Sequence, residues 1–184
     1  LGEGSEVLSL DEFSLEAPLL FKEAIEKIST HATIESWVVG GHSLGALLAL
    51  KFLAQEKSPQ PQLFAILVGF ASASKNGQHL YQDPLFEKML EFRSQLVSPA
   101  LHHKHFFPWI RIEKEQLELH GNSLLLLSGK DDLVARASEV EDLAKQLSLM
   151  GNEVDLKLVD KLPHHEPEKA ATLIRDYLKI KFDL

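Results

Sequence analysis

The sequence contains no cysteine, which excludes disulfide bonds, thiolate nucleophiles and zinc–thiolate sites. It also lacks an excess of positive charge, because 19 Lys and Arg face 27 Asp and Glu, for a formal net charge of -8. A nucleic-acid partner is therefore not expected, since phosphate binding needs a basic stripe. No apolar run approaches the roughly 18 residues that a bilayer span needs, and the first residues do not resemble a signal peptide. These absences together favour a cytoplasmic location and no membrane span.

The residues that are present predict a single α/β domain over residues 1–184. Hydrophobic residues make up 45% of the chain and charged residues 25%, which is an ordinary globular balance. Short apolar runs alternate with helical patterns along the chain. Strands are predicted at residues 6–10, 34–39, 63–68, 124–127 and 154–159, and helices from Pro18 onward and at residues 44–55, 138–150 and 169–180. This alternation predicts a mostly parallel sheet flanked by helices on both faces, in three layers.

The motif that carries chemistry is Gly41-His42-Ser43-Leu44-Gly45, a G-x-S-x-G between the strand at 34–39 and the helix at 44–55. A strand that turns sharply into a helix lifts the Ser43 hydroxyl off the sheet edge, and we expect both glycines to be required by close packing at this turn. The turn also directs the backbone N–H of Leu44 at a developing oxyanion. We interpret Ser43 as a nucleophile and His42 as a packing side chain.

A serine nucleophile needs a histidine and an acid, which in this architecture follow later strands in the order Ser, acid, His. The strand at 124–127 ends in Ser128-Gly129-Lys130-Asp131-Asp132, and the strand at 154–159 is followed by Pro163-His164-His165-Glu166-Pro167. Either Asp131 or Asp132, and either His164 or His165, satisfies this order.

These three segments resemble those of the α/β-hydrolase superfamily. VVGGHSLGALLAL resembles its nucleophile elbow, LLLLSGKDDLV its acid loop and LPHHEP its histidine loop. The resemblance implies a serine hydrolase that cleaves a small-molecule ester or thioester through an acyl-enzyme, without a metal or organic cofactor. It favours Asp132, three residues after Gly129, and His165, which precedes Pro167 as in a Gly-His-x-Pro pattern. Asp131 and His164 are the alternatives.

Residues 80–118 lie where this superfamily inserts lids or caps, and we expect a short helical lid-like insert interrupted by Pro84, Pro99 and Pro108. The insert carries a cluster of histidines beside aromatic residues: His102, His103, His105, Phe106, Phe107 and Trp109. Aromatic residues here can wall an acyl or alkyl pocket. No carboxylate stands at helical spacing from the histidines, so we interpret the cluster as surface lining and expect no metal site.

The second oxyanion donor that the superfamily implies is not found in the sequence. We therefore expect the chain to lack its N-terminal strands, with a missing segment or a partner chain covering that sheet edge; the sequence does not fix the oligomeric state. Two other functions stay open. G-H-S-L-G also occurs in malonyl-type acyltransferases, and a hydrolase-like domain without an oxyanion hole can be a non-catalytic binding module.

Overall fold

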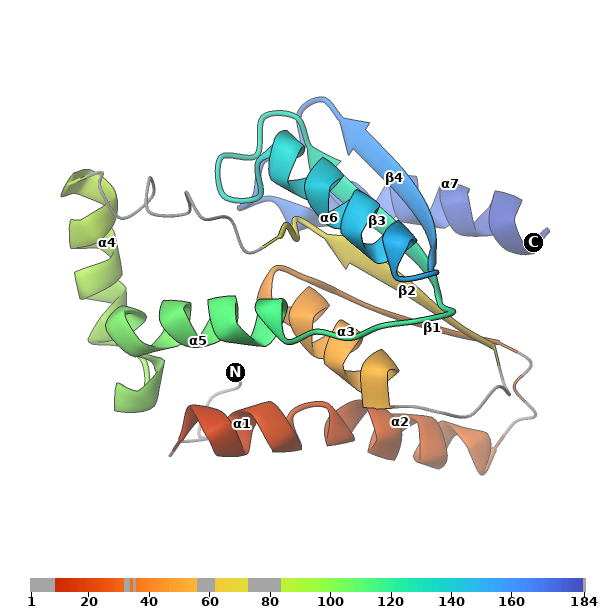
Figure 1. The fold of residues 1–184 in the computed structure, drawn as a ribbon, viewed down its shortest axis with the longest axis horizontal. Coiled ribbons are helices and arrows are strands. Elements are labelled where there is room, and N and C mark those ends of the chain that lie inside the picture. Colours follow the sequence, from red (N-terminus) through yellow and green to blue (C-terminus); the bar gives the residue numbers. More distant parts are fainter. Residues whose placement is uncertain (1–8, 32–33, 35, 56–61, 73–83, 184) are drawn as a thin grey trace.

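The computed structural model describes residues 9–31, 34, 36–55, 62–72 and 84–183. Its centre is a four-stranded parallel sheet with the order β1-β2-β3-β4 (Figure 1). The strands are β1 (Ser36–His42), β2 (Gln62–Val68), β3 (Ser123–Gly129) and β4 (Glu153–Val159). Val39 pairs with Ala65, Ala65 with Leu124, and Leu124 with Val154, so one row crosses all four strands. The predicted parallel sheet is confirmed.

Helices cover both faces of this sheet, as predicted. The sheet order follows the chain order, so right-handed crossovers place α3 (Leu44–Gln55) and α6 (Ala137–Leu149) on the same face. The short helix η3 (Pro167–Lys169) leads into α7 (Ala170–Phe182), which covers the opposite face (Figure 1).

Alternate residues of β3 serve the two faces. Leu124 and Leu126 join the core under α3 and α6, whereas Leu125 and Leu127 join the core under α7. All four leucines are at most 1% exposed. The continuous apolar run therefore reflects a strand buried on both faces.

The N-terminal part of the described chain is helical. Helices α1 (Leu10–Glu16) and α2 (Leu19–Ser29) follow one another, with Pro18 at the N-cap of α2. The strand predicted at 6–10 is wrong at Leu10, and residues 6–8 lie outside the described residues. The reason is local: Ser9 Oγ accepts a hydrogen bond from Glu12 N at 3.0 Å, and this Ser-x-x-Glu start of a helix overlaps the alternating pattern that predicts a strand.

The predicted insert contains α4 (Pro84–Ser94), the short helix η2 (Pro99–Leu101) and α5 (His103–Glu115), while residues 80–83 lie outside the described part. Pro84 and Pro99 begin their elements, but Pro108 lies inside α5, so the prediction that it breaks the helix is wrong. Packing of the next residue compensates for the missing N–H: Trp109 is 7% exposed and stacks on Phe106 at 5.7 Å between ring centroids.

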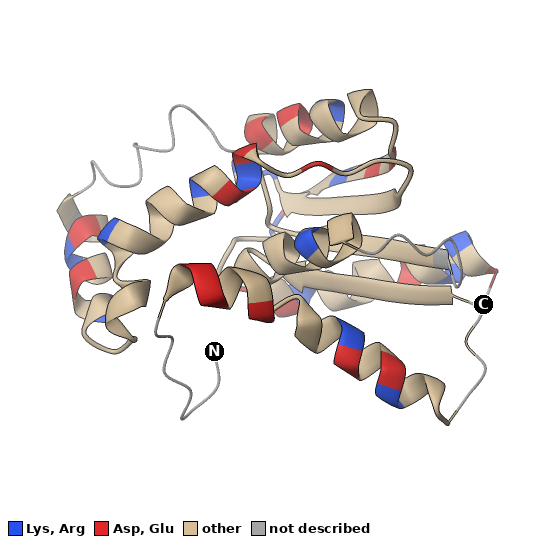
Figure 2. Cartoon of the chain, turned by 60° about the horizontal axis from the view of Figure 1, so that its bottom comes forward, with Lys and Arg blue, Asp and Glu red and all other residues tan. Residues whose placement is uncertain are grey.

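Charges of both signs alternate along the outer helices, as the blue and red segments of Figure 2 show. No helix in the described ranges is both long and apolar enough to cross a membrane. Among the described strands β1 is an edge that pairs only with β2, and Val38 on it is 42% exposed.

Candidate active site

Ser43 occupies a sharp turn between β1 and α3. Its φ is 53°, in the left-handed region that non-glycine residues rarely adopt. The turn is held on both sides, because Ser43 N donates to Val68 O at 3.0 Å and Ala46 N donates to Ser43 O at 3.1 Å. Strained backbone of this kind is concentrated at functional sites.

The two glycines of the motif have different roles. A Cβ on Gly41 would lie 2.2 Å from the carbonyl carbon of Gly45, so strand and helix can approach this closely only with glycine at position 41. A Cβ on Gly45 would meet no described atom within 4 Å. The expectation of a packing requirement is confirmed for Gly41 and wrong for Gly45, because the contact is made by the backbone of Gly45.

Leu44, the expected oxyanion donor, is the first residue of α3. The first N–H groups of a helix have no intrahelical acceptor and carry partial positive charge. The N–H of Leu44 directly follows Ser43, so the structure leaves a donor of suitable character beside the hydroxyl.

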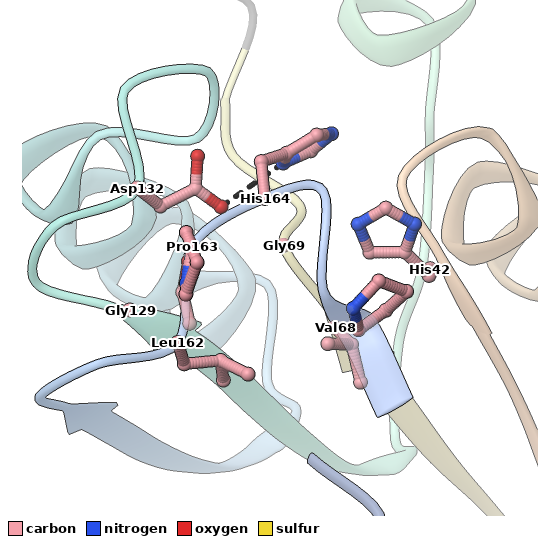
Figure 3. Close-up of a pocket in the computed structure, with 10 residues that line it drawn as sticks. His42, Val68, Gly69, Gly129, Asp132, Leu162, Pro163 and His164 are labelled. Carbon is pink, nitrogen blue, oxygen red and sulfur yellow. Dashed lines mark hydrogen bonds and ion pairs between the residues drawn. The ribbon is translucent and has the colours of Figure 1, made fainter. Parts of the chain in front are cut away.

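Asp132 is held in one orientation by the acid loop after β3. It is 3% exposed, and its Oδ1 accepts hydrogen bonds from the N–H groups of Val134 and Ala135, both at 2.8 Å. Its other oxygen, Oδ2, lies 2.9 Å from His164 Nδ1 (Figure 3). A buried carboxylate on a ring nitrogen fixes both the position and the tautomer of an imidazole.

The structure brings His164, and not His165, to Asp132. The His165 side chain is 78% exposed, and its Nε2 lies 3.3 Å from Glu166 Oε1. The His164 side chain is only 19% exposed. The pattern that favoured His165 relied on Pro167, whereas adjacent residues of this loop direct their side chains to different places. The geometry therefore favours the alternative, His164.

Asp131 ties the acid loop to the histidine loop. Its Oδ1 accepts a hydrogen bond from Leu162 N at 3.2 Å, and a Cβ on Gly129 would lie 1.9 Å from Leu162 O. Asp131 thus has a clear structural task, because it holds the chain at Leu162, two residues before His164. Of the two candidate acids, the structure places only Asp132 against an imidazole.

Gly69 is a site residue that the sequence reasoning missed. It follows β2 with φ 56°, and a Cβ there would lie 3.1 Å from both His164 Nδ1 and the His42 ring. A side chain at this position would press against both histidines. The available signal was a glycine directly after a buried strand, at the sheet edge where the other two loops begin.

The His42 ring packs against the ring of the candidate base, with an angle of 51° between the two planes. Its ring centroid lies 4.5 Å from that of His164, and its Nε2 is buried with no hydrogen-bond partner among the described residues (Figure 3). Burial lowers the pKa of His42, the His164 charge lowers it further, and Asp132 acts in the opposite direction. The lowered pKa favours the neutral form of His42, without a positive charge beside His164.

Ser43 Oγ makes no hydrogen bond to a described residue, including His164. The hydrogen bond between Asp132 and His164 is already formed in this structure, whereas a hydrogen bond from the Ser43 hydroxyl to the imidazole is not. Such contacts are often long without substrate and shorten when a reacting group is bound.

Comparison with known proteins identifies the architecture. No family model and no curated protein matches the sequence. An α/β hydrolase enzyme from the metagenome of sediments from the lagoon of Mar Chica, Morocco, is 20% identical with a TM-score of 0.56, over 89% of this chain and 68% of that one. The chain has the α/β-hydrolase fold.

Two other solved structures share this hydrolase fold. An α/β fold family hydrolase from Bacillus anthracis str. Sterne has a TM-score of 0.56 and 15% identity, over 94% of this chain and 76% of that one. An esterase from Pyrococcus furiosus has a TM-score of 0.53 and 16% identity, over 88% of this chain and 60% of that one. The sheet and the turn at Ser43 thus belong to a fold in which hydrolases and esterases are found.

Proposed function

We propose that this protein is a serine hydrolase that cleaves carboxylic esters or thioesters through an acyl-enzyme. The observation that carries the proposal is the buried Asp132–His164 pair, at the sheet edge where the strained turn presents Ser43. The fold of the esterases and hydrolases described above supports the same class of reaction.

In this mechanism the Ser43 oxygen attacks the carbonyl carbon of the substrate. His164 Nε2 takes the hydroxyl proton and returns it to the leaving alcohol or thiol, while Asp132 holds Nδ1 and stabilises the imidazolium. The Leu44 N–H donates a hydrogen bond to the tetrahedral oxyanion. A water molecule, deprotonated by His164, then releases the carboxylic acid and restores Ser43.

Labelling with a fluorophosphonate probe tests the nucleophile, because such a probe reacts with an activated serine. We expect the wild type to be labelled and to hydrolyse a short p-nitrophenyl ester. Ser43→Ala should lose labelling and at least about 10³-fold in kcat. The exposed Ser138 provides the matched control: Ser138→Ala should be labelled like the wild type. Labelling that persists in Ser43→Ala contradicts the proposal.

Adjacent residues in both loops provide further matched pairs. His164→Gln should lose the ester activity, whereas His165→Gln should keep most of it, since the His165 side chain is 78% exposed and its ion-pair partner among the described residues is Glu166. Asp132→Asn should lower kcat by about 10⁴-fold, because an amide favours the wrong tautomer of the histidine. Circular dichroism shows whether each variant is folded.

Two outcomes with the wild type would favour the alternative functions. A folded wild type that neither reacts with the fluorophosphonate probe nor hydrolyses the ester indicates a binding module. Acyl transfer to an acyl-carrier acceptor in preference to water indicates an acyltransferase.

A further inference from the structure

Three potential metal ligands meet in the insert, away from the candidate active site. Glu91 lies on α4, while His102 and His103 are the N-cap and first residue of α5. One ligand atom from each lies within 4.8 Å of the other two. His102 Nε2 is 4.0 Å from Glu91 Oε2, and His103 Nε2 is 3.8 Å from Glu91 Oε1.

The ring of His103 is oriented by a partner behind it. Its Nδ1 lies 2.9 Å from Ser94 Oγ, which also accepts a hydrogen bond from the His103 backbone N–H at 3.3 Å. A hydroxyl has acceptor capacity for both donors. When Nδ1 donates its proton to Ser94, Nε2 presents a lone pair toward Glu91. This hydrogen bond behind the ligand is the usual support for a metal-binding histidine.

We propose that Glu91, His102 and His103 form a zinc site that fastens α4 to the start of α5. Two imidazole nitrogens and one carboxylate are a donor set that suits Zn²⁺, with a fourth position open to water. The set was not recognisable in the sequence because Glu91 precedes His102 by eleven positions and His103 by twelve, and reaches them across the turn that contains η2.

The helix that this site would fasten exposes two of its large apolar side chains to solvent. Leu90 of α4 is 5% exposed, but Met89 is 52% and Phe92 is 64% exposed. Figure 1 shows α4 at the far end of the insert, with α5 running from it toward the sheet. A metal bridge between α4 and α5 would add a fixed contact between the two helices.

Two existing contacts must give way when zinc binds. Lys104 Nζ lies 3.4 Å from Glu91 Oε1, and the Lys104 side chain is 66% exposed, so it can turn into water. His102 Nδ1 accepts the Lys104 N–H at 3.3 Å, at the long end for a hydrogen bond. For Nε2 to bind zinc, His102 must carry its proton on Nδ1 and release that N–H.

Titration of the untagged, chelator-treated protein with Zn²⁺, read by competition with a chromophoric indicator, tests the site. We expect one equivalent to bind and to raise the thermal unfolding midpoint. Co²⁺ should give the visible ligand-field absorption of a low-coordinate nitrogen and oxygen site. Failure of the folded wild type to bind one equivalent of Zn²⁺ would overturn the proposal without affecting the proposed hydrolase.

Variants locate the bound metal. Glu91→Gln and His103→Gln should each weaken Zn²⁺ binding by more than about tenfold, since even the loss of a partner behind a ligand costs about 10- to 100-fold. His102→Asn should weaken it while keeping a good N-cap. His120→Gln, which removes a histidine elsewhere, should bind like the wild type. Equal weakening in His120→Gln would contradict the site.

Removal of the cation that competes with zinc for Glu91 should strengthen Zn²⁺ binding, in contrast to the variants above. Lys104→Gln should bind Zn²⁺ several-fold more tightly than the wild type, because Glu91 is then free of its ammonium partner. This residue is exposed, so the variant should fold normally. Weaker Zn²⁺ binding in Lys104→Gln would contradict the assignment of Glu91 as a ligand.

Discussion

The sheet and the insert are built by different means. In the sheet, Leu124 to Leu127 are buried on both faces, and the loops that follow the strands are joined by backbone hydrogen bonds. In the insert, α5 reaches the core through Trp109, whereas α4 has Met89 and Phe92 in solvent and forms ion pairs with the start of α5 through Glu91. The proposed catalytic groups all lie on the densely packed part, which suits a site that must hold its geometry to fractions of an ångström.

The two regions also differ in what fixes the side chains of interest. Asp132 is held by two backbone N–H groups, and His164 is confined by Gly69 and His42. Glu91 is 47% exposed and pairs with Lys104, which is 66% exposed, so it can rearrange around a ligand. The comparison indicates that the sheet carries preformed chemistry and that the insert is the adaptable part.

The largest expected effect on stability comes from the same leucine-to-alanine truncation made once in the sheet and once in the insert. Leu126 in β3 is 0% exposed and Leu96 in the insert is 72% exposed. Leu126→Ala should lower the free energy of unfolding by about 3–5 kcal/mol, because it removes buried methyl groups and leaves a cavity. Leu96→Ala should change it by less than about 0.5 kcal/mol. Urea unfolding measures both, and similar losses would contradict the contrast between the regions.

A smaller effect should distinguish the two glycines at the Ser43 turn. Gly41→Ala places a Cβ against the Gly45 backbone, which cannot move away as a flexible side chain could, and should cost about 3 kcal/mol of unfolding free energy. Gly45→Ala meets open space on a helix and should be neutral or stabilising by up to about 1 kcal/mol. Urea unfolding is again the measurement. A stability loss in Gly45→Ala equal to that in Gly41→Ala would show that the close approach is not at Gly41.

The sequence predicts the sheet and the turn at Ser43 because both are encoded locally. A run of four leucines has few alternatives to a doubly buried strand, and Gly41-x-Ser43 limits the backbone directly. The choice between His164 and His165 is different in kind. Neighbouring loop residues point in different directions. Which of the two meets Asp132 depends on how closely Gly69 and Gly129, which are both distant in the chain, approach the histidine loop.

The same distinction explains what the sequence could not supply elsewhere. Ser9 and Glu12 fit both an alternating strand and a helix start, so local pattern alone was ambiguous there. The meeting of Glu91 with His103 depends on how α4 folds back on α5. Helical spacing within the histidine cluster could not reveal a ligand from the preceding helix.

Lys114 connects the two regions and provides the smallest of the three effects. It lies near the end of α5, donates a hydrogen bond to Ala71 O at 2.8 Å, and sits 4.4 Å from the centroid of the Phe70 ring, in the loop after β2. Burial lowers the pKa of Lys114 from 10.5 to about 8, and Glu139 opposes this shift. Between pH 8 and 10.5 the folded protein therefore holds fewer protons on this group than the unfolded chain.

Stability contributed by a group of this kind rises with pH across that window. We expect the wild type to gain on the order of 2 kcal/mol of unfolding free energy relative to Lys114→Met between pH 7.5 and pH 10, given about 1.4 kcal/mol for each unit of pKa difference. Urea unfolding of both proteins at the two pH values measures the change, and titrations that both share cancel in the difference. Neutral lysine still donates to Ala71 O, so the tie between α5 and the sheet should persist at the higher pH. A difference that stays constant with pH would show that Lys114 is solvated and that the insert is held to the sheet by its aromatic residues alone.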